Sequence, residues 1–263
     1  MDAIALYNLE RWNTLAREDA LFTRPALDLT PETAREAIDP QNLLGAVSGK
    51  SVLLLAGGGG QQSAAFALLG ANVTVFDLSD AQLGREKVVA DHYSVIIETV
   101  GGDMRDLSGL PASHFDIVYH PYSLSLVPDA QVVFAEVARV LKPNGIYHFT
   151  LLNPFMAGMT FSDWDGESYR LRAPYVQGRT VTTPDASWVF REDQKPISPP
   201  QPNIEYVQTL SGILNGLVAK GFTLFHFSDN KDMYPDLNAE PGSWDHFVAY
   251  APPWLSFWLR FTG

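Results

Sequence analysis

Short apolar runs alternate with helix-like segments through the middle of the chain. Five such runs, rich in β-branched and aromatic residues, span 52–55, 72–76, 95–100, 115–119 and 146–151. A strand that is buried on both faces reads as a nearly continuous apolar run, which is typical of parallel sheets. The pattern therefore predicts an α/β fold in which a mostly parallel sheet carries helices on both faces.

Helix signals separate these runs. Residues 63–69 form a helix-compatible stretch after the first run, and Ser79 with Gln82 makes a capping box at the start of the next helix. Asp129 is the expected N-cap of a helix over 129–141, where apolar residues recur every three or four positions. The order strand, helix, strand, helix supports the parallel sheet.

The C-terminal part predicts one more helix and two more strands. The apolar face of that helix consists of Val207, Leu210, Leu214, Leu217 and Val218. We expect strands at 222–227 and 246–251, paired antiparallel because a polar loop and no helix is expected between them. The complete prediction is a Rossmann-like, seven-stranded, mostly parallel sheet with an antiparallel last strand.

Two segments are expected to cover this sheet. Residues 1–45 predict an N-terminal helical lid, with a helix start at Thr30 followed by Pro31. The main domain then spans 46–263 and contains an inserted cap at about 152–203. The aromatic residues of this cap are Phe155, Phe161, Trp164, Tyr169, Tyr175, Trp188 and Phe190.

The last residues, 251–263, are also rich in aromatic side chains. Trp254, Phe257, Trp258 and Phe261 have helical spacing. Core packing against the sheet is the favoured interpretation, and the alternatives are an anchor for a partner, for a second copy or for a membrane surface.

Charge and composition exclude several functions. The chain has 18 Lys and Arg against 30 Asp and Glu, a net charge of −12, which disfavours nucleic acid as a partner. It has no cysteine, so thiolate metal sites and a cysteine nucleophile are excluded, and its histidines have no metal-like spacing. With no signal-peptide pattern and no run of 18 apolar residues, we expect a cytoplasmic protein without a transmembrane segment.

The turn after the first run is the main candidate site. Four glycines, Gly57 to Gly60, separate a buried strand from a helix start, so bare backbone N–H groups can face a ligand there. Asp77 ends the neighbouring strand, where a carboxylate can accept hydrogen bonds from a ribose. The alternative role for Asp77 is to stabilise the dipole of the following helix.

Two further strand ends carry polar residues. Asp103 can accept from an adenine amino group with Met104 against the ring, or it can belong to a simple Asx turn. His120 ends the fourth strand, where an imidazole can act as a general base or can be a structural histidine bonded to backbone. Ligands of open α/β sheets bind at this edge.

These motifs in this order resemble class I S-adenosylmethionine-dependent methyltransferases. The stretch Ala56-Gly57-Gly58-Gly59-Gly60 is similar to the glycine motif of that family, and Leu141-Lys142-Pro143-Asn144-Gly145 is similar to its turn before strand five. Within the family, the glycine stretch is similar to a bacterial small-molecule subgroup of the ubiquinone/menaquinone methyltransferase type.

The resemblance implies S-adenosylmethionine as cofactor and S-adenosylhomocysteine as product. His120 and Tyr122 are the expected catalytic residues. The expected cofactor-binding residues are Ala56, Gly57, Gly58, Gly59, Gln62, Asp77, Leu78, Gln82, Asp103, Met104 and His120. No metal is implied.

The chain departs from the family pattern beside the glycine turn. Leu54 stands where the family has an acid that helps to orient the turn, and Ala56 replaces the first glycine. The candidates to compensate at the amino-acid end of the cofactor are Gln61, Gln62, Tyr7 and Arg11. Arg11 can pair with the cofactor carboxylate or lie on a solvated helix face.

The favoured function is methyl transfer to a small-molecule acceptor in a pocket that excludes water. A non-catalytic, cofactor-binding or scaffold protein is the first alternative, because the strand-one acid is missing. A nicotinamide-dependent oxidoreductase is disfavoured, since no register of the glycines fits Gly-x-Gly-x-x-Gly. The expected partner is the small molecule that accepts the methyl group. A homodimer with a second copy of this chain stays an open alternative.

Overall fold

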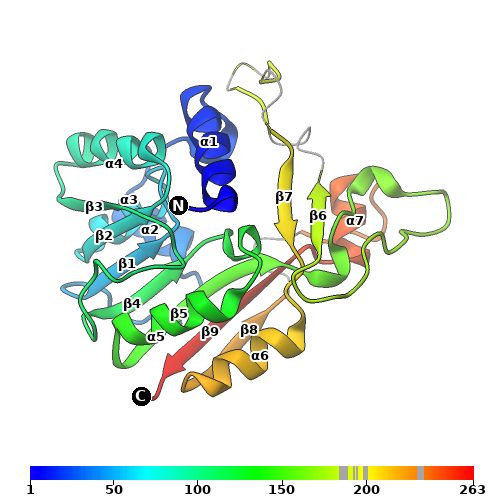
Figure 1. Cartoon of the computed structure of the whole chain (residues 1–263). Helices are drawn as coiled ribbons and strands as arrows, with labels where there is room; N and C mark the ends of the chain where they lie inside the picture. The colour runs from blue at the N-terminus through cyan, green and yellow to red at the C-terminus, as the bar shows by residue number, and fades with distance from the viewer. Residues whose placement is uncertain (184–188, 192, 194, 198–200, 230–233) are drawn as a thin grey trace.

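The fold is built on one seven-stranded sheet (Figure 1). This computed structural model describes residues 1–183, 189–191, 193, 195–197, 201–229 and 234–263. The strand order is β3-β2-β1-β4-β5-β9-β8, and β9 runs antiparallel to both of its neighbours. The bounds are β1 Ser51–Leu55, β2 Asn72–Asp77, β3 Ile97–Gly101, β4 Phe115–His120, β5 Leu141–Leu152, β8 Phe222–Ser228 and β9 Trp254–Phe261. The predicted Rossmann-like sheet is confirmed.

Helices pack on both faces of the sheet. They are α1 Ala3–Arg17, α2 Pro31–Ile38, α3 Gln62–Leu68, α4 Asp80–Tyr93, α5 Ala130–Val140, α6 Leu210–Ala219 and α7 Trp244–Tyr250. Side chains of α5 and α6 join Leu53 and Leu55 of β1 in one buried cluster. Those of α2 and α3 join Val52 and Leu54 in another. Because side chains alternate along a strand, the continuous apolar run of β1 fills both layers.

The predicted N-caps begin their helices, but the capping box predicted at α4 is incomplete, because the Ser79 N–H donates to Asp77 Oδ1 and not to the Gln82 side chain. The Ser79 hydroxyl accepts from the Gln82 N–H at 3.1 Å at the start of α4. The Asp129 carboxylate accepts from the Gln131 N–H at 2.9 Å at the start of α5. Each of these contacts satisfies a backbone donor that the first helical turn leaves open.

The strand predicted at 246–251 is wrong. Residues 246–250 belong to α7, which begins where the Ser243 hydroxyl accepts from the His246 N–H at 3.3 Å. The helix buries Phe247 and Val248 against Met156 and Met159 of the inserted segment. Tertiary contacts with the insertion therefore decided between helix and strand for a short apolar run that fits both patterns.

The aromatic tail is the missing strand, β9, and its predicted helical spacing is wrong. Phe257 stacks on Phe149 with ring centroids 4.8 Å apart, and Trp258 stacks on His148 at 4.4 Å. Neighbouring residues of a strand point to opposite faces, so these two rings fill different layers of the core. The favoured interpretation, packing of the tail in the core, is confirmed.

The buried face of α6 also differs from the predicted one. Ile213 and Leu217 are buried against the sheet, whereas Leu214 and Val218 are exposed. The helix starts at Leu210, after the Thr209 cap, and Val207 is buried outside it. The apolar residues of this segment are too many to select one face by spacing alone.

The N-terminal and inserted segments meet near the ends of the parallel strands (Figure 1). The Tyr7 hydroxyl of α1 donates to the Pro202 carbonyl oxygen of the insertion at 2.5 Å. The Asn8 side chain donates to the Leu126 carbonyl oxygen, in the segment after β4, at 3.1 Å. The insertion holds a two-stranded sheet, β6 Thr180–Thr183 and β7 Asn203–Tyr206. The domain bounds of lid and cap stay a prediction.

Two aromatic residues of the insertion pack onto α7. Trp164 lies edge-on to His246 with ring centroids 4.8 Å apart, and the Tyr169 hydroxyl lies 2.9 Å from His246 Nδ1. Trp188, another aromatic residue predicted for the cap, lies outside the described residues.

Within the part of the chain that the structure describes, no helix combines the length and the apolar character needed to cross a membrane.

The two-layer core makes a stability prediction. Phe149→Ala should lower the free energy of unfolding by about 3–5 kcal/mol, because it removes a fully buried ring and leaves a cavity. Phe225→Ala, at a ring that is 40% exposed on β8, should cost less than about 1 kcal/mol. Urea unfolding of the two variants and the wild type measures both values, and equal losses would contradict this account of the core.

Candidate functional site

The glycine turn between β1 and α3 lies close to the carboxylate that ends β2. A Cβ added at Gly58 would come within 3.0 Å of Asp77 Oδ2 and within 2.8 Å of Gln82 Cβ, so only glycine allows this approach. Gly59 and Gly60 have φ values of +115° and +83°, in the left-handed region that favours glycine. Ala56 has φ of +47°, so the turn already leaves regular strand geometry at this residue.

Asp77 contacts the glycine turn, the start of α4 and the segment that follows β3. Its Oδ2 accepts from the Gly58 N–H at 2.9 Å, and its Oδ1 accepts from the Ser79 N–H at 2.8 Å. Its carbonyl oxygen accepts from the Gly102 N–H at 2.9 Å. Burial raises the pKa of the Asp77 carboxyl. An ionised carboxylate has about four lone-pair positions, so these contacts leave room for ligand hydroxyls.

A second buried carboxylate, Glu86 of α4, holds the far side of the same turn. Its Oε1 accepts from the Gly60 N–H at 2.8 Å, and its Oε2 accepts from the Ser63 hydroxyl at 2.5 Å. Burial raises the pKa of Glu86 to about 7, and the nearby charge of Asp77 adds to the effect. The sequence interpretation missed Glu86; the signal for it was an acid in line with Gln82 and Val89 on the buried face of α4.

Gln82 lies beside the turn with an unused acceptor. Its side chain is buried, and Oε1 has no hydrogen-bond partner among the described residues. A Cβ added at Gly59 would lie 3.5 Å from that oxygen. A buried acceptor without a partner is costly, so a ligand donor at this place would stabilise the site. Leu78 lies half-buried after Asp77, and Gln62 lies half-buried at the start of α3.

Asp103 is held in an ion-pair network after β3. Arg105 contacts both Asp103 oxygens, with Nη2 2.6 Å from Oδ2, and also reaches Asp2 at 2.8 Å. Paired carboxylates on both sides hold the pKa of Arg105 above its ordinary value. Met104 packs against the cluster that contains Leu53 and Leu55. The network thus ties the start of α1 to the predicted adenine site.

His120 is buried at the end of β4, with both ring nitrogens in contact. Nδ1 lies 3.0 Å from the Tyr147 hydroxyl, and Nε2 lies 2.7 Å from the Ser123 hydroxyl. The ring has no exposed surface, and this burial lowers the pKa of His120 to about 3. The imidazole is therefore neutral at pH 7 and connects β5 to the segment after β4.

Tyr122 points from this segment to a carboxylate of the insertion. Its hydroxyl donates to Glu205 Oε1 on β7, and the Ser125 hydroxyl donates to the same oxygen at 3.0 Å. Burial and the charge of Glu205 raise the pKa of Tyr122 well above its ordinary value. Glu205 is itself buried, and no local pattern in the sequence indicates its role.

The glycine turn and the Tyr122 segment are direct neighbours. A Cβ added at Gly57 would lie 3.3 Å from the Pro121 ring, and β1 pairs with β4 through Leu54 and Tyr119. The structure thus brings Gly57, Gly58, Asp77, Gln82 and His120 to one edge of the sheet. This edge consists of the carboxyl ends of the parallel strands, where such sheets bind ligands.

Three of the residues considered as replacements for the strand-one acid, Tyr7, Arg11 and Gln61, have other contacts. Gln61 Nε2 donates to the carbonyl oxygens of Phe22 and Arg24, both at 2.9 Å. Arg11 is 1% exposed and donates to the Gln201 carbonyl oxygen of the insertion, so it does not lie on a solvated helix face.

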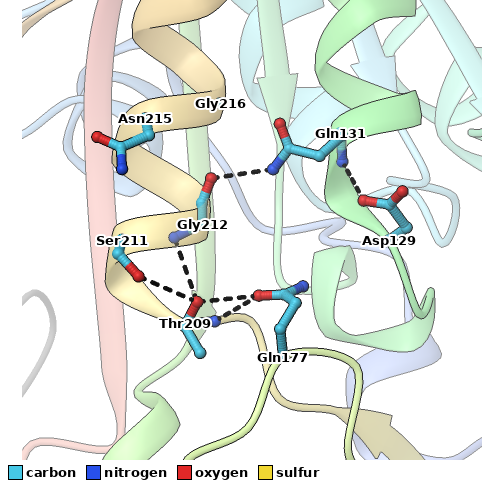
Figure 2. A pocket seen from close by; sticks show the side chains of 8 residues that line it. All are labelled: Asp129, Gln131, Gln177, Thr209, Ser211, Gly212, Asn215 and Gly216. Atoms are coloured by element: carbon cyan, nitrogen blue, oxygen red, sulfur yellow. Dashed lines mark hydrogen bonds between the residues drawn. The ribbon is translucent and has the colours of Figure 1, made fainter.

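A separate hollow of about 530 Å³ lies where α5 and α6 meet (Figure 2). Its polar groups contact one another: Gln131 Nε2 donates to the Gly212 carbonyl oxygen, and Gln177 Oε1 accepts from the Thr209 N–H, both at 2.9 Å. Gln131 lies against bare backbone at Gly216. The first contact joins the two helices, and the second joins the insertion to the start of α6.

Comparison with known proteins gives consistent matches. Residues 53–149 match the family model described as a methyltransferase domain. An uncharacterized methyltransferase of Bacillus subtilis is 30% identical over 73% of either chain. A ubiquinone biosynthesis O-methyltransferase of Bordetella avium is 34% identical over 43% of this chain, which spans about half (47%) of that relative.

A solved structure has the same fold. The S-adenosylmethionine-dependent methyltransferase of Mesorhizobium loti superposes with a TM-score of 0.61 at 22% identity, over 89% of this chain and 100% of its own.

Burial of neutral His120 predicts acid sensitivity. Its folded pKa of about 3 lies below the ordinary 6.5, so the unfolded chain binds the extra proton and stability falls as pH drops below 6.5. The buried imidazole should therefore lower the free energy of unfolding by about 2 kcal/mol at pH 5 relative to pH 7.5. Urea unfolding across this range should show that the free energy of unfolding falls less with pH in His120→Gln than in the wild type.

His92→Gln, at an exposed position on α4, is the control for this experiment and should keep the wild-type pH dependence. An unchanged pH dependence in His120→Gln would contradict the role of the buried imidazole.

Proposed function

This chain belongs to the S-adenosylmethionine-dependent methyltransferases, and we propose that it methylates a small-molecule acceptor at the edge where the glycine turn meets the insertion. When bound, S-adenosylmethionine supplies a methyl group that is already activated, so the protein has to supply alignment, exclusion of water and a path for the proton of the acceptor.

The residues at the strand ends fit this cofactor. Asp77 can accept from the ribose hydroxyls, because its present contacts use only part of its acceptor capacity. The buried Gln82 oxygen lacks a donor among the described residues, and the glycines let Asp77 and Gln82 lie close against the bare backbone of the turn. Asp103 and Met104 lie one strand further along, where the adenine is expected.

The hydrogen bond from Tyr122 to Glu205 is the observation that carries the proposal. Tyr122 follows Pro121, whose ring lies beside Gly57, and its hydroxyl donates to Glu205 on β7. Tyr122 therefore joins the segment next to the glycine turn to the insertion. The Tyr122 oxygen can take a proton from an acceptor while its own proton passes to Glu205. This relay starts with a neutral tyrosine, in agreement with the raised pKa of Tyr122.

His120 has a positioning role in this proposal. Its Nε2 contacts the Ser123 hydroxyl next to Tyr122, and its Nδ1 contacts Tyr147 of β5. Both contacts fix the start of the segment that carries Tyr122. A neutral, enclosed ring suits this task better than exchange of protons with an acceptor.

If the proton of the acceptor passes through Tyr122 to Glu205, changes at either residue should lower kcat. Tyr122→Phe and Glu205→Gln should each lower kcat roughly 100- to 10,000-fold, because they remove proton transfer in the transition state. Their affinity for S-adenosylhomocysteine should stay near that of the wild type. Assays with methyl-labelled S-adenosylmethionine and a panel of phenols, carboxylic acids and amines, together with calorimetry, measure the two quantities.

Two further variants are controls. Tyr175→Phe removes a hydroxyl that accepts from the Leu210 N–H elsewhere in the insertion, and it should leave kcat unchanged. Asp77→Ala should weaken cofactor binding. Cofactor binding by the wild type without turnover of any compound in the panel would favour the non-catalytic alternative.

A further inference from the structure

Leu54 cannot orient the glycine turn, although it occupies the position where the family has an acid. Its side chain is fully buried in the apolar cluster with Val52, Phe66 and Tyr119. Burial of a carboxylate at this position without a partner would be strongly unfavourable. The turn therefore depends on another anchor.

Glu86 reaches the turn from the neighbouring helix. Its carboxylate is 1% exposed and accepts from the Gly60 N–H at 2.8 Å and from the Ser63 hydroxyl at 2.5 Å. One turn further along α4, Val89 packs against Gly60 so closely that a Cβ there would come within 2.5 Å of its Cγ2. Glu86 thus contacts the last glycine of the turn and the first turn of α3 together.

We propose that Glu86 is the positioning residue of the cofactor loop and that, in this chain, it replaces the carboxylate missing from strand one. The inference rests on the proposed function only in that the loop binds the cofactor. Asp77 fixes the turn at Gly58, and Glu86 fixes it two residues later, at Gly60. With both contacts in place, the bare backbone between them is pre-organised, and binding does not have to order it.

The hydrogen-bond acceptor of Glu86 is the critical feature, more than its charge. Glu86→Gln keeps an oxygen of the same reach for the Gly60 N–H. Glu86→Asp keeps the charge but is one methylene shorter, so it cannot span the same distance. The two variants separate the position of the acceptor from the charge.

Glu136 provides a matched control on the opposite face of the sheet. Its Oε2, on α5, accepts from the Leu107 N–H at 2.8 Å, so it too is a helix carboxylate that holds a loop amide. Glu136→Asp makes the same chemical change away from the glycine turn. It measures how far cofactor affinity changes when a helix carboxylate that accepts from a loop N–H is shortened elsewhere in the fold.

Calorimetry with S-adenosylhomocysteine tests the proposal, with thermal unfolding to establish that each variant is folded. Glu86→Asp should bind roughly 10- to 100-fold more weakly than the wild type, as expected when a buried backbone N–H loses its acceptor. Glu86→Gln should stay within about threefold, and Glu136→Asp should not change affinity. A folded Glu86→Asp with wild-type affinity would overturn the proposal, as would equal weakening in Glu136→Asp.

Hydrogen exchange at the Gly60 amide of the ligand-free protein tests the role of Glu86 separately from the proposed methyl transfer. Faster exchange in Glu86→Asp than in the wild type and in Glu86→Gln supports the anchor, and equal exchange in all three overturns it. If the wild type binds no S-adenosylhomocysteine, the proposed function fails, and the exchange result alone then decides whether Glu86 holds the turn.

Discussion

Two buried carboxylates hold the turn on which the site depends. Asp77 accepts from the Gly58 N–H and Glu86 accepts from the Gly60 N–H, so β2 and α4 fix the same short segment from two directions. Both carboxyls have raised pKa values because burial disfavours their charged forms. The backbone donors of the turn compensate part of that cost, which makes the two acids and the turn one interdependent unit.

The proposed acceptor side of the site is assembled from segments far apart in the chain. Tyr122 follows β4, whereas Glu205 belongs to β7 of the insertion, and a hydrogen bond from the Tyr122 hydroxyl joins them. His120 connects the Tyr122 segment back to β5 through Tyr147. The position of the insertion therefore determines whether the proposed relay can form, and the sheet determines where Tyr122 starts relative to the glycine turn.

The sheet and most of its helices could be predicted because each depends on local signals. Apolar runs buried on both faces, the Ser79 and Asp129 caps and the glycine turn carry their own structural preferences. The region after β8 could not be predicted in the same way. Residues 246–251 are too short for periodicity to decide between helix and strand, and contacts with Met156 and Met159 favour the helix.

The sequence by itself determined the Rossmann-like architecture, the glycine turn and the acids at the strand ends, because buried apolar runs, helix caps and turn chemistry depend on neighbouring residues. Only the tertiary structure decided which side chains complete the site. Glu86 acts across a helix–turn contact and Glu205 across the insertion, and neither contact has a signature in local spacing. Burial likewise decided that His120 is neutral and enclosed, since the pKa of an imidazole depends on surroundings that the whole fold supplies.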